Sequence, residues 1–269
     1  MGQILFIPHG GGPLPLLGDP GYARLADALR SLHATVGASR AILLVTAHWE
    51  ADLPCLSTAP HPEMLFDYYG FPEESYRFTY PAHGATDLIE PVVSALEAQG
   101  TGALRDPERG FDHGTFVPMM LIRPEADIPI LQMSLMSSLD PEQHLGMGRA
   151  LAGLLEQDIT LIGSGFSFHN IEALIGRSRV DLEAGYSKAR EFHARIDEAV
   201  CAEGLGPGDR AKRLIDWEQV PGARFCHPRE EHLLPLHVCV GAALEAGMKA
   251  EQIFSEPVKG YQTSGYRWS

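Results

Sequence analysis

The chain has 269 residues, 45% of them hydrophobic and 21% charged, which is the composition of a globular protein able to bury a sizeable core. Its formal net charge of -14 argues against binding to nucleic acid or to an anionic membrane, because both need basic patches. No apolar run approaches the roughly 20 residues of a membrane span, and the first residues do not resemble a signal peptide. We therefore expect a cytoplasmic protein whose four scattered cysteines are reduced thiols.

Apolar runs alternate with amphipathic stretches along the chain. Strands are predicted at residues 4–9, 41–48, 128–135 and 159–165. Helices are predicted at 22–36, 85–100, 140–157, 181–203, 208–217 and 229–247, with Asp140 as the N-cap of the third. Residues 110–124 begin as a loop and become a short helix, and the last twenty residues are irregular or strand-like. The long stretch 54–83 is irregular, but its aromatic content predicts that it is ordered.

This alternation predicts an α/β fold, a three-layer α/β/α arrangement around a mostly parallel or mixed sheet. Since the sequence shows no repeat, low-complexity segment or linker, we expect residues 1–269 to form a single domain. Ligands in such folds gather at the carboxyl ends of the strands. His9 and His48 are the last residues of the first and second predicted strands, and His169 follows the fourth. The three histidines are therefore predicted to lie at one edge of the sheet.

Other candidate site residues lie in turns and at helix starts. His113 stands in "GFDHGTF", where an Asp-His-Gly turn can also be purely structural, with Asp112 bonded to its own backbone. Glu231 and His232 stand in "REEHLLPLH", at the predicted start of a helix, where a glutamate is often only a partner of the helix dipole. Trp49, beside His48, is interpreted as a packing residue.

A cluster of histidines suits a catalytic metal better than a structural one. Neutral imidazole binds zinc and iron well. Two histidines on adjacent loops, with one more histidine or glutamate, would hold a metal on one side and leave open positions on the other. No cysteine stands near these positions, which disfavours a structural zinc site.

The remaining histidines are assigned no role in the site. Those within predicted helices are expected at the surface or the edge of the core: His33, His144 and His193. Three lie in loops and join no constellation: His61, His83 and His227. His237 is expected to point away from His232.

Five segments together resemble a known family. "PHGGGP", "VTAHWE", "GFDHGTFVPM", "GSGFSFHN" and "EEHLLPLHVCVGAA" occur in the order and spacing of the class III extradiol ring-cleavage dioxygenases. The resemblance covers about residues 4–260 and is strongest to the branch typified by 4,5-DOPA extradiol dioxygenase. The aromatic stretch "FDYYGFPEESYRFTYPAHG" at 66–84 is also similar to a loop of that branch.

The resemblance implies a non-haem Fe(II) site, with zinc possible in purified protein. His9 and His48 match the first two metal ligands, and His232 matches the third. Protocatechuate-type relatives use a glutamate there, so Glu231 is the alternative. His169 matches the catalytic histidine, which can also be a fourth ligand before substrate binds. His113 matches a histidine that either contacts the substrate or lies next to the metal ligands without binding the metal itself.

Two departures from the family pattern concern the substrate. The first loop reads "HGGGPLPLL" where DOPA-type members have "HGSP", and two phenylalanines, Phe166 and Phe168, precede His169 in place of small residues. The aromatic residues of the loop at 66–80 either wall the substrate pocket or form a packed surface loop: Phe66, Tyr68, Tyr69, Phe71, Tyr76, Phe78 and Tyr80.

The resemblance therefore implies a dioxygenase that opens the ring of a catechol-type substrate, a small aromatic diol, with both atoms of O2. The reaction needs open metal positions for the diol and oxygen, and a group that accepts and returns protons, a role a histidine can fill near neutral pH. His169 is the candidate. The alternatives are a zinc hydrolase on the same scaffold and a non-enzymatic relative that binds metal or protein. The sequence predicts no oligomeric state.

Overall fold

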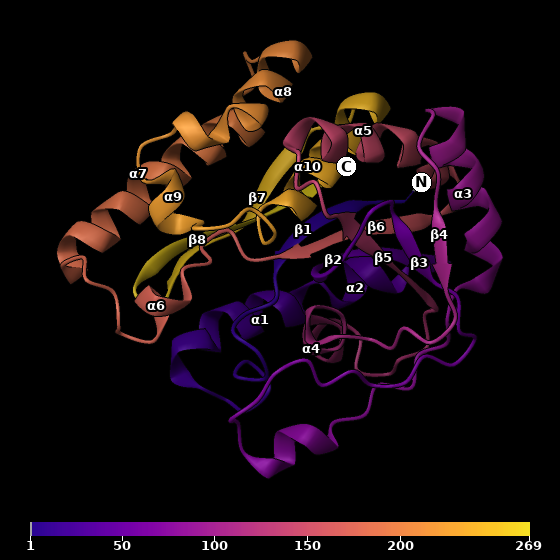
Figure 1. Ribbon diagram of the computed structural model, residues 1–269, viewed down its shortest axis with the longest axis horizontal. Helices are drawn as coiled ribbons and strands as arrows, with labels where there is room; N and C mark the ends of the chain where they lie inside the picture. Colours follow the sequence, from indigo (N-terminus) through magenta and orange to yellow (C-terminus); the bar gives the residue numbers. More distant parts are fainter. Residues whose placement is uncertain (1) are drawn as a thin grey trace.

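An eight-stranded mixed sheet forms the centre of the molecule (Figure 1). The computed structural model describes residues 2–269, and its strands lie in the order β4-β3-β5-β2-β6-β1-β8-β7. Four central neighbours run parallel: β5 (Ile130–Met136), β2 (Ala41–Ala51), β6 (Ile159–Gly165) and β1 (Ile4–Pro8). Leu161 of β6 pairs with Leu43 on one side and with Ile4 on the other.

Short or antiparallel strands complete the two edges of the sheet. On one side β5 is followed by β3 (Cys55–Ser57) and β4 (Leu104–Asp106). These three-residue strands were not predicted, because so short a segment shows no hydrophobic period. On the other side β8 (Tyr261–Trp268) pairs antiparallel with β1 and with β7 (Ala250–Val258). The end of the chain is thus a β-hairpin, in agreement with its strand-like sequence.

Each central strand has side chains in two separate apolar layers. Ile4 and Phe6 of β1 belong to one core, whereas Leu5 and Ile7 belong to the other, as the alternation of a strand requires. Figure 1 shows helices on both sides of the sheet. One core is covered by α3 (Ile89–Ala98), α5 (Pro141–Leu151), α7 (Leu182–Cys201) and α10 (Leu234–Ala246). The other is covered by α1 (Ala23–Ser31), α2 (His33–Gly37) and α4 (His113–Ile122). The predicted three-layer α/β/α fold is confirmed.

Shorter helices connect these elements. The α-helical ones are α6 (Ile171–Leu174), α8 (Pro207–Ile215) and α9 (Ala223–Cys226). The 3-10 turns are η1 (Pro20–Tyr22), η2 (Glu73–Arg77), η3 (Thr86–Leu88), η4 (Ala152–Gln157) and η5 (Trp217–Gln219). Among residues 2–269, no helix combines the length and the apolar character that crossing a membrane requires.

Several predicted helices have different bounds in the structure. The helix expected at 22–36 divides into α1 and α2 at Leu32, and that expected at 140–157 continues from α5 into η4. Asp140 does cap α5, accepting hydrogen bonds from the backbone N–H groups of Glu142 and Gln143. The helix expected at 229–247 begins only at Leu234, with Pro235 in its first turn, where no backbone N–H is needed. His232 therefore lies in the turn before α10.

Candidate metal centre

Three adjacent parallel strands deliver histidines to one end of the sheet. His9 directly follows β1, and His169 follows β6 after three intervening residues. His48 lies within β2, where the register with β5 shifts between Val45 and Glu50. Four residues of β2 stand there opposite one of β5, so this irregularity takes His48 out of the regular ladder.

The other two candidate histidines come from outside the sheet. His113 is the first residue of α4, whose N-cap Asp112 accepts a hydrogen bond from the backbone N–H of Thr115. His232 lies in the turn that precedes α10. Both segments lie beyond the carboxyl ends of the parallel strands and bring their side chains to those of the first three histidines.

All five predicted histidines lie in one cluster. The ring of His9 lies 4.8 Å from that of His48, 5.2 Å from that of His232 and 5.3 Å from that of His113, between centroids. The ring of His169 stacks on that of His232 at 3.3 Å.

The potential ligand atoms of the cluster fall into two groups. Those of His9, His48 and His113 lie within 4.8 Å of one another, as do those of His169, Glu231 and His232. The Nε2 atoms of His48 and His232, 3.2 Å apart, join the two groups. The expected ligand set of His9, His48 and His232 thus spans both groups.

Burial keeps the central imidazoles neutral. It lowers the pKa of His9, His48 and His232 well below the ordinary value of histidine, and neighbouring histidines lower each pKa further. A proton on one ring would repel a proton on the next. At neutral pH these side chains therefore offer nitrogen lone pairs, which is the form that binds a metal.

His9 shows that the cluster fits a metal ion. It is 1% exposed, and neither Nδ1 nor Nε2 has a hydrogen-bond partner. A neutral imidazole carries one donor and one acceptor, and leaving both unpaired in the protein interior is costly. A cation at one ring nitrogen would satisfy that acceptor, and the lone pairs of the neighbouring rings suit the same ion.

Asp67 contacts two of the histidines through its two carboxylate oxygens. Its Oδ1 accepts hydrogen bonds from Nδ1 of His113 at 2.8 Å and from the backbone N–H of His113 at 3.0 Å. Its Oδ2 lies 3.5 Å from Nδ1 of His48. Although burial alone would raise it, the pKa of Asp67 is lowered by the hydrogen bond from His113. Asp67 was not among the predicted site residues, because its only sequence signal is a position within the aromatic stretch.

Glu231 has the corresponding place beside the other two histidines. Its Oε1 lies 2.9 Å from Nδ1 of His232 and 3.2 Å from Nδ1 of His169. Burial opposes ionisation, but the hydrogen bond from His169 lowers the pKa of Glu231. The carboxylate thus meets the Nδ1 atoms of both rings, while Nε2 of His232 faces His48.

A network of polar contacts fixes the segment that carries His48. Arg109 donates to the carbonyl oxygen of His48 at 3.1 Å and to Oδ2 of Asp112 at 2.8 Å. Its guanidinium also lies 4.9 Å above the ring of Trp49. Buried Asp112 accepts a further hydrogen bond from Thr46 at 2.9 Å. The ring of Trp49 thus packs against the guanidinium that holds the backbone of His48.

An ion pair joins this segment to the turn that carries His232. Arg229 donates to both carboxylate oxygens of Glu50, at 2.5 and 2.6 Å. The same guanidinium lies 3.6 Å from Oε2 of Glu231. Glu50, which had no assigned role from sequence, thus links the end of β2 to the segment that precedes α10.

The aromatic residues of the loop at 66–80 differ widely in their surroundings. Tyr68 lies 5.8 Å from the ring of His113 and belongs to an aromatic cluster with Phe66, Phe71, Tyr76 and Phe116. Tyr69 is 91% exposed, and Tyr80 is buried with its hydroxyl bonded to the carbonyl oxygen of Arg123. Most of the loop therefore packs against itself and α4, and Tyr68 has the ring contact with a clustered histidine.

The two phenylalanines before His169 are both fully buried. The ring of Phe166 lies 6.3 Å from that of His9, so it contributes to the wall behind the cluster. The ring of Phe168 stacks on that of Tyr261 at 4.2 Å. Phe168 belongs to the core covered by α7 and α10, so its size serves packing there.

Several histidines outside the cluster are core residues. His144 and His193, expected at the surface or the core edge, are 0% and 1% exposed, because other elements cover the helix faces that carry them. His227, expected in a loop and outside any constellation, is fully buried and donates from Nε2 to the carbonyl oxygen of Ser167 at 2.7 Å. Burial lowers its pKa to about 3. His237 also points away from the cluster, with Nε2 2.9 Å from the carbonyl oxygen of Leu214.

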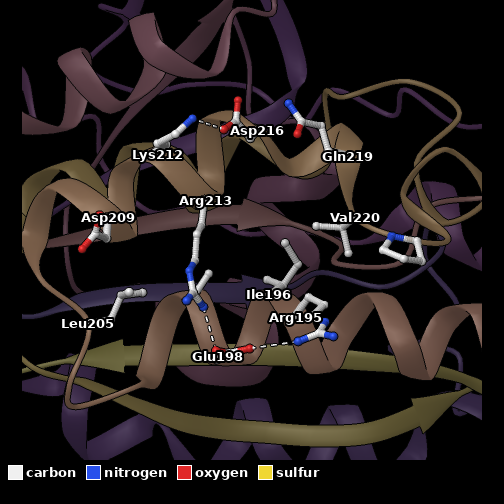
Figure 2. Close-up of a pocket in the computed structure, with 12 residues that line it drawn as sticks. Arg195, Ile196, Glu198, Leu205, Asp209, Lys212, Arg213, Asp216, Gln219 and Val220 are labelled. Carbon is white, nitrogen blue, oxygen red and sulfur yellow. Dashed lines mark hydrogen bonds and ion pairs between the residues drawn. The ribbon is translucent and has the colours of Figure 1, made fainter.

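A separate cleft of about 560 Å³ lies between α7, α8 and η5 (Figure 2). Two groups of its charged side chains pair within the cleft. Glu198 accepts from Arg213 at 2.7 Å and from Arg195 at 3.4 Å, and Lys212 pairs with Asp216. None of the clustered histidines lines this cleft, so it is no part of the candidate metal centre.

Comparison with known proteins identifies the class of this chain, a ring-cleaving dioxygenase from a family like the class III extradiol dioxygenases. Residues 20–266 match the family described as the catalytic LigB subunit of aromatic ring-opening dioxygenase, and the chain belongs to that family. The resemblance inferred from the sequence motifs is thereby confirmed.

Individual relatives agree with this assignment. Dioxygenase tasH of Hapsidospora irregularis is 41% identical over 262 residues, which cover 91% of this chain and 79% of that protein. The 4,5-DOPA dioxygenase extradiol of Portulaca grandiflora is 36% identical over 216 residues, covering 80% and 76%. The crystal structure of an uncharacterized protein from Escherichia coli K12 superposes with a TM-score of 0.76 over the whole of both chains. At 23% identity this last likeness shows the fold alone.

Proposed function

We propose that this protein is a non-haem Fe(II)-dependent extradiol dioxygenase that cleaves the ring of a catechol-type substrate, DOPA-like or related, with O2. The family and the relatives named 4,5-DOPA dioxygenase extradiol support the reaction class. The observation that carries the metal assignment is the buried imidazole of His9, with two unpartnered nitrogens among neutral histidine rings.

In this proposal the metal ligands are His9, His48 and His232. The close approach of the Nε2 atoms of His48 and His232 supports a shared ion between them. Glu231 is already engaged with Nδ1 of His232, which favours the histidine over the glutamate as the third ligand. His169 is the proposed fourth ligand before substrate binds, and the stacking of its ring on that of His232 supports this role. Fe(II) is the proposed ion of the active enzyme, and zinc is the expected occupant after purification without iron.

When bound, the iron supplies open positions at which the two diol oxygens and O2 come together for electron transfer. The protein must then manage the protons of the diol. A hydrogen bond from Nδ1–H of His169 to Glu231 leaves Nε2 of that ring as the basic nitrogen. The carboxylate also stabilises the imidazolium formed when His169 takes a proton. His169 is therefore the proposed acid and base, because it can return that proton later in the reaction.

His113 is proposed to orient the substrate. Its Nδ1–H is donated to Asp67, so its Nε2 is free to accept a hydrogen bond from a diol hydroxyl. The ring of Tyr68, 5.8 Å from that of His113, adds an aromatic wall beside it. Together these side chains would present one polar and one apolar contact to an aromatic diol.

We propose that residues 1–269 form one catalytic domain, and the family match over residues 20–266 supports this. The four cysteines are free thiols, and this supports a reducing compartment such as the cytoplasm.

Anaerobic reconstitution with Fe(II), followed by oxygen uptake and absorbance measurements with several catechols, tests the function. We expect oxygen consumption together with a yellow ring-opened product. Protein with confirmed bound iron that consumes no oxygen with any catechol would overturn the proposal, and hydrolysis by the zinc form would then favour a hydrolase.

A further inference from the structure

We propose that Asp67 is a positioning residue that fixes both the tautomer and the orientation of His113 and His48. This inference rests on the proposed function, since it concerns how the metal ligand His48 and the substrate-orienting His113 are held. Asp67 lies in the aromatic stretch at 66–84, and the resemblance to the family assigns no role to it.

The hydrogen bonds of Asp67 determine which nitrogen of His113 carries the proton. A carboxylate can only accept, so Nδ1 of His113, 2.8 Å from Oδ1, must be the donor. Its Nε2 then keeps a lone pair. Oδ1 also accepts from the backbone N–H of His113, the first residue of α4, so the carboxylate fixes the ring and its backbone together.

The second carboxylate oxygen acts on His48 in the same sense. Oδ2 lies 3.5 Å from Nδ1 of His48, at the distance of an ion pair, and favours a proton on that nitrogen. The lone pair of His48 is then on Nε2, the atom that faces Nε2 of His232. One carboxylate thus sets the tautomers of two rings whose centroids are 3.8 Å apart.

The aromatic loop holds Asp67 in place. The backbone N–H of Asp67 donates to the carbonyl oxygen of Leu65 at 3.0 Å. On one side the ring of Phe66 packs on that of Phe116 in α4 at 5.8 Å, and on the other the hydroxyl of Tyr68 donates to the carbonyl oxygen of Ser75 at 2.6 Å. The side chain of Asp67 is 20% exposed. The aromatic loop is therefore connected to the proposed metal ligand His48 through the carboxylate of Asp67.

The substitution Asp67→Asn separates this role from a merely structural one. The amide oxygen can still accept from the backbone and Nδ1 of His113, so the start of α4 keeps its partner. The amide NH2 then faces His48 and favours a lone pair on Nδ1, which moves the proton to Nε2. If Asp67 only supported the start of α4, the protein would tolerate this change. If Asp67 also sets the tautomer of the metal ligand His48, the change should weaken metal binding.

The experiment measures Co(II) affinity by competition with a chelator, and the Co(II) d–d spectrum, in wild type and in three variants. We expect Asp67→Asn to weaken Co(II) binding by about 10- to 100-fold and to change the spectrum. Asp67→Glu, which keeps the charge, should restore part of the affinity. Asp127→Asn, which removes an exposed ion pair with Arg123, is the matched control and should behave as wild type.

Wild-type affinity and an unchanged spectrum in Asp67→Asn would overturn the inference, even if the enzyme cleaves catechols. If instead the variant loses metal while iron-loaded wild type consumes no oxygen with any catechol, the positioning role stands and the proposed function fails. Circular dichroism of the metal-free proteins checks that each variant is folded. A loss of affinity in Asp67→Asn that Asp67→Glu leaves wholly unrestored, in folded protein, would also count against the role of the carboxylate.

Discussion

The Nε2 atoms of His48 and His232 lie 3.2 Å apart, although 184 residues separate the two histidines in the chain. One ring comes from an irregularity in β2 and the other from the turn before α10. Two nitrogens cannot both carry protons at this distance without repulsion, and burial holds the pKa of both rings low. The arrangement is the one expected of two ligands that share an ion.

The identity of the third ligand can be tested by a pair of substitutions. His232→Ala should abolish stoichiometric binding of Fe(II) or Zn(II), because it removes a proposed ligand. Glu231→Gln should keep the metal with an affinity about 10- to 100-fold lower, since the carboxylate supports His232 from its Nδ1 side. Metal content after dialysis and titration of the remaining site measure both. The reverse pattern, with metal lost only in Glu231→Gln, would make the glutamate the ligand.

His169→Ala should retain metal and lose turnover. The side chain is proposed to accept and return a proton, a contribution of about 10²- to 10⁴-fold to the rate. Oxygen uptake at saturating catechol gives kcat, and metal analysis of the same sample gives occupancy. The control is His61→Ala, because His61 lies outside the histidine cluster. Loss of metal in His169→Ala would instead make His169 chiefly a ligand.

The pair formed by Arg229 and Glu50 should matter more to the site than to the fold. The arginine side chain is 52% exposed, so Glu50→Gln should lower the free energy of unfolding by less than about 1 kcal/mol. Metal affinity should fall by several-fold, because the pair joins the segments of His48 and His232. Glu90→Gln, which breaks the exposed pair with Arg105, should leave metal affinity unchanged. Equal metal affinities in the two variants would contradict the linking role of Glu50.

His144 should make the protein less stable in acid. Its Nδ1 donates to the carbonyl oxygen of Asp140 and its Nε2 accepts from the backbone N–H of Met136, which requires a neutral ring. Burial lowers its pKa to about 4, against 6.5 for an unperturbed histidine. Between these values the unfolded chain binds a proton that the folded chain does not. Stability should therefore fall by about 3 kcal/mol as the pH drops from 6.5 to 4.

Urea unfolding of wild type and His144→Gln across that pH range isolates the effect of His144. The difference in stability between the two proteins should shrink as the pH falls, because the variant has no ring to protonate. If the difference in unfolding free energy between the two proteins stays constant from pH 7 to pH 4, the pKa of His144 is the same in the folded and the unfolded chain.

The sequence predicted the elements whose pattern is local. The strand expected at 159–165 is β6 with the same bounds, because its apolar run ends at a Gly-Ser-Gly turn. Asp140 marks the start of α5 for the same reason, since a cap acts within a few residues. His9, His48 and His169 were predicted to lie at one end of the sheet because each stands at or just after the end of a predicted strand, and parallel strands end at the same edge.

Other features depend on contacts that no local pattern contains. The burial of His144 follows from the packing of α5 on α10, whereas a helical period shows which residues share a face but not what covers it. Asp67 and Glu50 become parts of the candidate site only through His113 and Arg229, which lie 46 and 179 residues away in sequence. The contacts of Asp67 and Glu50 with the candidate site could therefore be recognised only from the structure.

The most direct test of the central claim uses ¹⁸O2 with the Fe(II)-loaded protein and a catechol that it consumes. An extradiol dioxygenase places both oxygen atoms in the ring-opened product, so mass spectrometry of rapidly quenched product should find two ¹⁸O atoms. Oxygen uptake without ring opening, or a product whose added oxygen comes entirely from water, would contradict the account of the histidine cluster as a dioxygenase centre.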